Sequence, residues 1–216
     1  MEARGALPLL LLLTLMQPLI AGEDTVIGNG QGRLEVVSAN LQLLPQWSGL
    51  LKRLVSDRQQ LAACEADIDQ CASHRWIAWL GKLHSLENLA ADELLEQVNS
   101  YVNGFPPKSD RDNYQLEEYW ASPLEFLERS GDDEDAAVMK YFMLREQGIP
   151  ASSLRITQLK DSLENRIDTV LLYSSSAGGE QVLSSRRDLL LPLSQMRYST
   201  PVYSVNEENY WLYIDP

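Results

Sequence analysis

The sequence predicts an α+β domain in which N-terminal helices and a buried central helix precede a C-terminal antiparallel sheet. In the first half, apolar residues recur at helical spacing, whereas short β-branched and aromatic runs separated by Gly and Ser turns follow Pro150. Between the two halves, residues 136–144 are apolar on nearly every side apart from Lys140, which is typical of a helix surrounded by protein. Helices first and strands second is the order of an α+β domain.

Three amphipathic helices are predicted in the first half of the chain. The apolar repeats that define them begin near Trp47, Trp76 and Leu94. Asn103-Gly104 ends the third repeat, and the segment from Phe105 to Asn113 contains two consecutive prolines, so it is predicted to be loop.

The starts of two further helices can be predicted from their capping residues. Ser122, Pro123 and Glu125 stand in the order of a capping box with proline at the first helical position. Gly131 breaks the short helix that follows, and Asp132 is expected to cap the buried central helix.

Five short runs are predicted to be strands of one antiparallel sheet, because brief connections separate them. They are Leu154–Thr157, Thr169–Tyr173, Gln181–Leu183, Pro201–Ser204 and Tyr210–Tyr213.

Composition limits the classes of partner. The chain has 216 residues, 44% of them hydrophobic, which is enough to bury one sizeable core, and this length favours one domain over two. The formal net charge of −13 argues against nucleic acids and anionic lipid headgroups as partners, because both are polyanions that require a Lys/Arg surface.

Residues 1–21 are predicted to be a signal peptide. Arg4 supplies a positive charge, an apolar run extends from Ala6 to Met16, and Ala21 offers a small residue for cleavage. The run is too short to span a bilayer. We therefore expect a periplasmic or secreted protein; an uncleaved signal that anchors the chain is the alternative, because Leu19 is large for its place before the cleavage site.

The remaining chain is predicted to comprise a leader over residues 22–46 and a single domain over residues 47–216. Four glycines between Gly22 and Gly32 indicate a flexible start to the leader.

The only two cysteines, Cys64 and Cys71, are predicted to form a disulfide in an oxidising compartment. On one straight helix they would lie roughly 10 Å apart along the axis, beyond disulfide reach. The bond therefore requires a break in the helix, for which the acidic run from Glu65 to Asp69 is suited. The alternative is two reduced cysteines packed apart.

Several ordered motifs make the sequence resemble the bacterial transglutaminase-like cysteine proteinases, which have a papain/transglutaminase-like fold. The motifs lie at Val98–Asn103, Tyr119–Leu127, Gly131–Ala137, Lys140–Phe142, Gly148–Pro150, Leu154–Ile156 and in a tail that includes Tyr203-Ser204, Asn206-Glu207 and Trp211-Leu212. The resemblance covers roughly residues 47–212.

The resemblance implies that all three catalytic positions are substituted. Where the family has Gly-Asp-Cys-Glu-Asp, this chain has Asp133 in place of the cysteine. Asp168 stands where the family places its general base, a histidine, and Ser184 follows the Val-Leu pair after which the family has an aspartate. Aspartate can neither attack a carbonyl as a thiolate does nor replace an imidazole near neutral pH, so Cys-His acyl transfer is lost.

We therefore expect a catalytically inactive homologue that acts by protein binding or regulation at the cell envelope. The resemblance implies an envelope protein or adhesin-like polypeptide as partner, with membrane contact only through that partner or an uncleaved signal. The alternative is a residual or altered peptidase that uses the acidic cluster, with Asp133 and Asp168 as an acid/base pair. His74 and His84 are expected to be packing or surface residues, and Arg186-Arg187 a surface pair or an internal partner for an acid.

Calcium is the one candidate cofactor; otherwise none is expected. Family members bind calcium through acids that flank the cysteine, and Asp132 and Glu134 match those places. Hard oxygen ligands suit calcium. The alternative is that these acids only cap the helix and complement its dipole.

Overall fold

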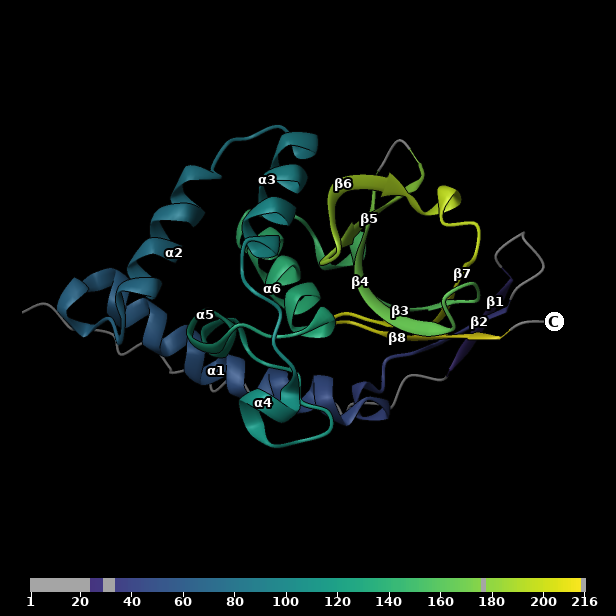
Figure 1. The fold of residues 1–216 in the computed structure, drawn as a ribbon, viewed down its shortest axis with the longest axis horizontal. Helices are drawn as coiled ribbons and strands as arrows, with labels where there is room; N and C mark the ends of the chain where they lie inside the picture. Colours follow the sequence, from purple (N-terminus) through teal and green to yellow (C-terminus); the bar gives the residue numbers. More distant parts are fainter. Residues whose placement is uncertain (1–23, 29–33, 176–177, 215–216) are drawn as a thin grey trace, which may run out of the picture.

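The computed structural model describes residues 24–28, 34–175 and 178–214. Within this part of the chain, helices pack to one side of an 8-stranded antiparallel sheet, as Figure 1 shows. The predicted signal peptide lies outside the described residues. Among the described helices, none has both the length and the apolar character that a bilayer crossing requires.

The helices agree with the predicted order. They are α1 (Pro45–Ala66), α2 (His74–Ser85), α3 (Ala91–Asn103), α4 (Asp110–Tyr114), α5 (Pro123–Arg129) and α6 (Asp133–Glu146). The capping box of α5 is present, with both the side chain of Ser122 and that of Glu125 in place. Helix α4 corrects the prediction of loop over residues 105–113: Ser109 caps it by accepting a hydrogen bond from the amide of Asp112.

The sheet contains all five predicted strands, each longer than predicted or extended at one end. Its strands are β1 (Thr25–Gly28), β2 (Leu34–Ser38), β3 (Leu154–Asp161), β4 (Arg166–Ser174), β5 (Glu180–Ser184), β6 (Arg187–Pro192), β7 (Ser199–Val205) and β8 (Tyr210–Ile214). Their spatial order is β1-β2-β8-β7-β3-β4-β5-β6. Strand β6 was not predicted from the sequence.

Strands β1 and β2 also correct the interpretation of the leader. The segment Gly22–Gly32 was expected to be flexible, but its described part forms β1, which pairs with β2. Strand β2 in turn pairs with β8, from Leu34 opposite Ile214 to Ser38 opposite Tyr210. The part of the leader from Thr25 to Gly28 and from Leu34 to Ser38 therefore belongs to the sheet.

Helix α6 is the buried centre of the molecule, as predicted. Every residue from Asp135 to Leu144 is buried, and the helix lies between α3, α5 and the sheet (Figure 1). Trp47 of α1 stacks on Phe142 at 6.0 Å between ring centroids and donates its indole N–H to the carbonyl of Asn206. Because α6 is packed on all sides, the position of its first residues at the edge of the core is fixed.

The predicted disulfide between Cys64 and Cys71 is present. The helical break that it requires is present as well, because α1 ends at Ala66 and a short 3-10 turn, Ile68–Gln70, follows. The two Cα atoms lie 4.4 Å apart.

Candidate functional site

The first turn of α6 meets the strands of the sheet at Asp133. The turn that precedes α6 requires glycine at residue 131. A Cβ atom added to Gly131 would lie 2.1–2.6 Å from side-chain atoms of Asp135 and would collide with them. Asp135 is buried and accepts a hydrogen bond from the amide of Ala121 at 2.6 Å. Burial raises the pKa of Asp135 to about 8.

Asp133 and Asp168 lie on either side of one guanidinium group. Arg186 Nη2 lies 2.7 Å from Asp133 Oδ2, and Arg186 Nε lies 3.0 Å from Asp168 Oδ1. Ser185 Oγ donates to Asp133 Oδ1 at 2.6 Å, and Arg166 forms a second ion pair with Asp168 at 2.9 Å. The two aspartates are thus each paired with arginine, and Arg186 is the internal partner of acids that one of the alternatives predicted.

Ser184 is close to this network but does not contact either aspartate. It is buried at the end of β5, and its hydroxyl accepts a hydrogen bond from the amide of Arg186 at 3.2 Å. The structure therefore brings Asp133 and Asp168 together through Arg186, and Ser184 shapes the turn that carries this arginine.

Helix α3 holds the turn between β5 and β6 in place. Asn99 Nδ2 donates to the carbonyls of Arg187 and Asp188, both at 2.9 Å. Asn103 Nδ2 donates to the carbonyl of Ser184 at 3.1 Å, and Asn103 Oδ1 accepts from Nζ of Lys140 at 2.8 Å. Burial lowers the pKa of Lys140 to about 7. These two asparagines belong to the Val98–Asn103 motif, which explains in physical terms why that motif accompanies the site.

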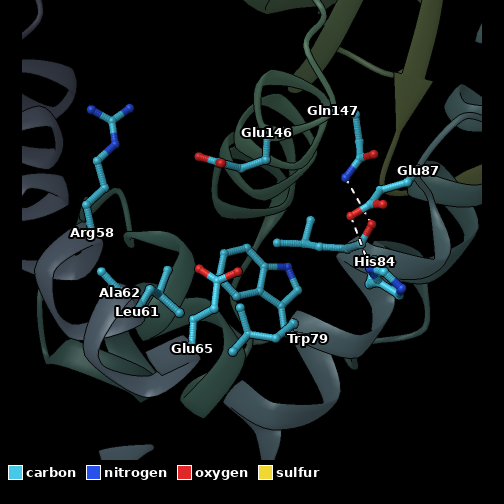
Figure 2. A pocket seen from close by; sticks show the side chains of 11 residues that line it. Arg58, Leu61, Ala62, Glu65, Trp79, His84, Glu87, Glu146 and Gln147 are labelled. Atoms are coloured by element: carbon cyan, nitrogen blue, oxygen red, sulfur yellow. Dashed lines mark hydrogen bonds and ion pairs between the residues drawn. The ribbon is translucent and has the colours of Figure 1, made fainter. Parts of the chain in front are cut away.

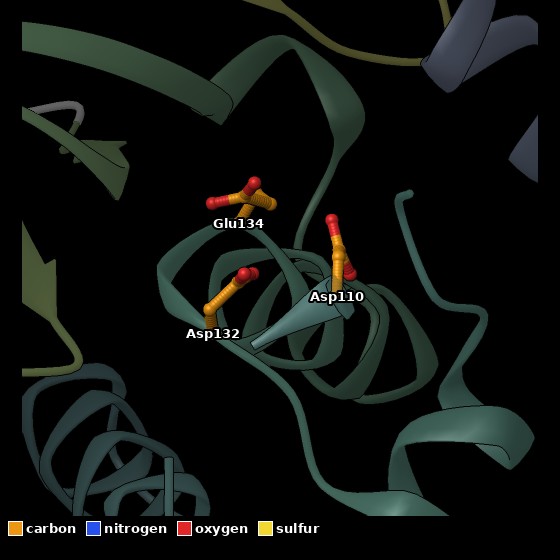
Figure 3. Close-up of side chains that lie close together, drawn as sticks. All are labelled: Asp110, Asp132 and Glu134. Atoms are coloured by element: carbon orange, nitrogen blue, oxygen red, sulfur yellow. The ribbon is translucent and has the colours of Figure 1, made fainter. Parts of the chain in front are cut away.

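A second group of carboxylates lies beside Asp133, and among the described residues none of its members forms an ion pair. Asp110, Asp132 and Glu134 each offer an oxygen, and these oxygens all lie within 4.8 Å of one another (Figure 3). Asp110 is the first residue of α4. The segment just before α4 is bonded to the turn before α6, because the amide of Lys108 donates a hydrogen bond to the carbonyl of Gly131 at 2.9 Å. Two of these three residues, Asp132 and Glu134, were predicted as calcium ligands, whereas Asp110 was assigned to a loop without a metal role.

The electrostatics of this carboxylate cluster favour a cation. Burial, with the neighbouring charge of Asp110, raises the pKa of Asp132 to about 6. Burial, with the charge of Asp132, raises the pKa of Glu134 to about 9. One buried oxygen of Asp110 and one of Asp132 have no hydrogen-bond partner among the described residues. The three acids are therefore poorly stabilised as anions by the protein alone, and their hard oxygen atoms form a donor set compatible with calcium.

The capping interpretation of these acids fits less well. Asp132 is the N-cap residue of α6 by position, but its side chain makes no capping hydrogen bond. Its carboxylate instead points toward the other two acids, as Figure 3 shows.

The two histidines lie elsewhere. Both belong to α2 and are exposed, and His84 Nδ1 contacts Glu87 Oε1 at 3.1 Å. The prediction of surface histidines is confirmed for both.

The described geometry can be compared with known proteins. A family model described as "Bacterial transglutaminase-like cysteine proteinase BTLCP" matches residues 60–216. The chain belongs to this family. A comparison with curated protein sequences gave no match.

Solved structures of LapG from Legionella pneumophila are similar to this family member. The calcium-bound LapG structure is 35% identical, with a TM-score of 0.59, and the match covers 64% of this chain and 78% of LapG. A second LapG structure gives the same values, and the EGTA-treated one gives a TM-score of 0.58 with 76% of LapG covered. The predicted family and the predicted α+β, transglutaminase-like fold are confirmed.

Proposed function

We propose that this family member is catalytically inactive and acts by binding a protein. The observation that carries the proposal is the Asp133–Arg186–Asp168 network. It occupies the two positions that the family resemblance assigns to the nucleophile and its base, and a guanidinium group fills the space between them.

The inventory of reactive groups supports the same proposal. The sequence contains two cysteines, and both are bonded to each other, so no thiol is left to act as a nucleophile. Both histidines are exposed on α2, a helix separate from the one that carries Asp133. The groups that attack and that transfer protons in Cys-His chemistry are thus missing from the site.

The alternative is an altered peptidase that uses Asp133 and Asp168. Aspartic chemistry requires two carboxylates that hold a water between them and share a proton. Here each carboxylate pairs with arginine, which favours two anions over one shared proton. This geometry gives the alternative less support than the binding function.

Hydrolysis of fluorogenic peptides tests the proposal. The purified protein is expected to release no fluorophore with calcium or with EGTA, and Asp133→Cys alone is expected to remain inactive because no base is present. An active cysteine proteinase of the family serves as positive control. Turnover by the unmodified protein that Asp133→Asn and Asp168→Asn abolish would establish the altered peptidase instead.

We further propose that Asp110, Asp132 and Glu134 bind calcium in this chain. The donor set, the raised pKa values of two of the acids and the calcium-bound state of LapG support this. Calcium is expected to raise the melting temperature relative to EGTA, and magnesium to raise it less, because magnesium loses its waters reluctantly. Equal melting temperatures in calcium and EGTA would contradict the proposal.

We also propose that the protein is periplasmic or secreted and that its partner is a protein of the cell envelope. A protein partner at the cell envelope, such as an adhesin-like polypeptide, agrees with the predicted signal peptide and with the net charge of −13, which disfavours nucleic acid. Fractionation of cells that express the full chain is expected to place it in the periplasm or the medium.

A further inference from the structure

A second concave surface lies at the opposite end of α6 from Asp133. It is a groove between α1, α2 and the C-terminal end of α6 (Figure 2), and its apolar lining comprises Leu61, Ala62, Trp79, Leu80 and Leu83. Helix α6 has 14 residues, so its two ends lie about 20 Å apart. The groove is therefore separate from the acidic site.

The walls of the groove are fixed to one another. The disulfide at Cys64 holds the end of α1, and Gln147 at the end of α6 donates to the carbonyl of Leu83 in α2 at 3.0 Å. A groove with walls held in this way is already formed before a ligand arrives, which reduces the ordering that binding requires.

The rim of the groove carries negative charge that the protein does not neutralise. Glu65 and Glu146 are exposed there, and neither forms an ion pair within the described part of the chain. Arg58 and His84 also line the groove, but they pair with Glu207 at 3.5 Å and with Glu87 at 3.1 Å. The negative end of the α6 dipole lies at the same place, so the rim favours a cation.

The indole of Trp79 lies in the lining of the groove, and its N–H group is buried beneath that surface. Trp79 is 2% exposed, and its indole N–H has no partner among the described residues. A buried donor left unpaired costs about 1–3 kcal/mol. In Figure 2 the ring lies across the middle of the groove, with its nitrogen on the edge toward His84.

We propose that this groove binds a lysine or arginine side chain of a partner polypeptide. The alkyl stem packs on Leu61 and Trp79, and the charged end lies between Glu65 and Glu146. The inference rests on the proposed protein-binding function and names the chemistry that the partner presents.

The test is the indole N–H signal of Trp79 in a proton–nitrogen NMR spectrum of the intact protein. Capped Gly-Arg-Gly and Gly-Lys-Gly peptides are expected to shift this signal in a saturable way. Gly-citrulline-Gly, which is nearly isosteric with the arginine peptide but uncharged, is expected to bind about tenfold more weakly, because the rim contribution is electrostatic. Gly-Leu-Gly tests whether an apolar side chain is enough.

Matched variants locate the effect. Glu65→Gln with Glu146→Gln is expected to weaken arginine peptide binding about tenfold. Glu93→Gln with Glu96→Gln removes the same charge from exposed positions of α3 and is expected to leave binding unchanged.

Three outcomes would overturn the inference: an unmoved Trp79 signal, equal binding of the arginine, citrulline and leucine peptides, or equal weakening in both double variants. None of them bears on peptide hydrolysis. Conversely, hydrolysis by the unmodified protein would contradict the proposed function without moving the Trp79 signal, so the two failures are distinguishable.

Discussion

Asp133 and the two acids that flank it occupy one turn of chain but have opposite electrostatic surroundings. Asp133 has both carboxylate oxygens satisfied, by Arg186 and Ser185. Asp132 and Glu134 face Asp110 instead, and neither forms an ion pair within the part of the chain that the structure describes. The same turn thus contains one carboxylate paired with arginine and two acids whose oxygen atoms form a donor set compatible with calcium.

The difference follows from where the helix turn points its side chains. Asp133 is directed toward the β5–β6 turn, which brings an arginine, whereas Asp132 and Glu134 are directed toward α4, which brings another acid. Neighbouring positions of one turn therefore differ in what they present: Asp133 is held in an ion pair, whereas Asp132 and Glu134 offer oxygen atoms compatible with calcium. A substitution that disrupts the turn should remove both the Asp133–Arg186 ion pair and the carboxylate cluster. Substitutions of single side chains should affect one of the two and leave the other.

The largest effect is expected from Gly131→Ala. The added Cβ collides with the side chain of Asp135, which must move away from the amide of Ala121. Overpacking and the loss of a buried hydrogen bond together should lower the free energy of unfolding by about 4 kcal/mol. Urea unfolding of the purified variant measures this. Gly81→Ala is the control, because a Cβ there would meet no atom within 4 Å, and a loss as large in the control would contradict the assignment.

The second prediction concerns the pH dependence of the free energy of unfolding, to which Asp132 and Glu134 of the cluster contribute. The folded-state pKa values of Glu134 and Asp132 are raised to about 9 and about 6, so the folded chain binds more protons than the unfolded chain between their unfolded and folded pKa values. In EGTA the free energy of unfolding should therefore fall by several kcal/mol as pH rises from about 4 to 9, and Asp135, whose pKa burial raises to about 8, adds to the same fall. Calcium should reduce the part that comes from Asp132 and Glu134, because it stabilises their ionised forms, and should leave the part that comes from Asp135. A pH profile that is identical with and without calcium would contradict a cation in the cluster.

A third prediction distinguishes two contributions to stability: the binding of calcium by the cluster and the electrostatic repulsion among its three acids. Asp110→Asn removes one charge from the cluster and keeps a side chain of the same size. In EGTA the variant should be as stable as the parent or more so, whereas the stabilisation by saturating calcium should fall by about 2 kcal/mol. Thermal unfolding in both conditions measures this. The control is Asp112→Asn, an exposed acid of the same helix that lies outside the cluster.

Sequence reasoning predicted the parts of this region that depend on local pattern. The buried helix α6 followed from an apolar run interrupted only by Lys140, and the start of α5 followed from Ser122 and Glu125. The break between Cys64 and Cys71 followed from helix geometry alone. In each case the deciding contacts lie within a few residues of chain.

The parts that could not be predicted depend on contacts between distant segments. Asp110 joins the cluster because α4 is attached to the turn before α6, a contact that the composition of a predicted loop does not reveal. Strand β1 forms only because β2 pairs with β8 at the other end of the chain. Arg186 could be assigned to an acid but not to a particular one, because the strand register decides which carboxylates it reaches.

The smallest change in the free energy of unfolding is expected from removing the arginine that pairs with Asp133. This substitution tests whether Arg186 stabilises the folded protein. Arg186→Met leaves Asp133 and Asp168 without the guanidinium between them. The side chain of Arg186 is 46% exposed, so solvent screens the interaction, and the free energy of unfolding should fall by about 1 kcal/mol. Asp133→Asn in the Arg186→Met background should recover part of that loss, since one of two like charges is gone.

Arg187→Met is the matched control for this position, because Arg187 is the next residue and its side chain forms no ion pair among the described residues. If both arginine variants lose the same stability, the bridge between the two aspartates contributes nothing and the site is an open acidic turn. If only Arg186→Met loses stability, and Asp133→Asn partly restores it, residue 133 is held by an ion pair at the start of α6. In that case a cysteine introduced at residue 133 would lie beside Arg186, away from both histidines on α2, so we expect Asp133→Cys alone to show no peptidase activity.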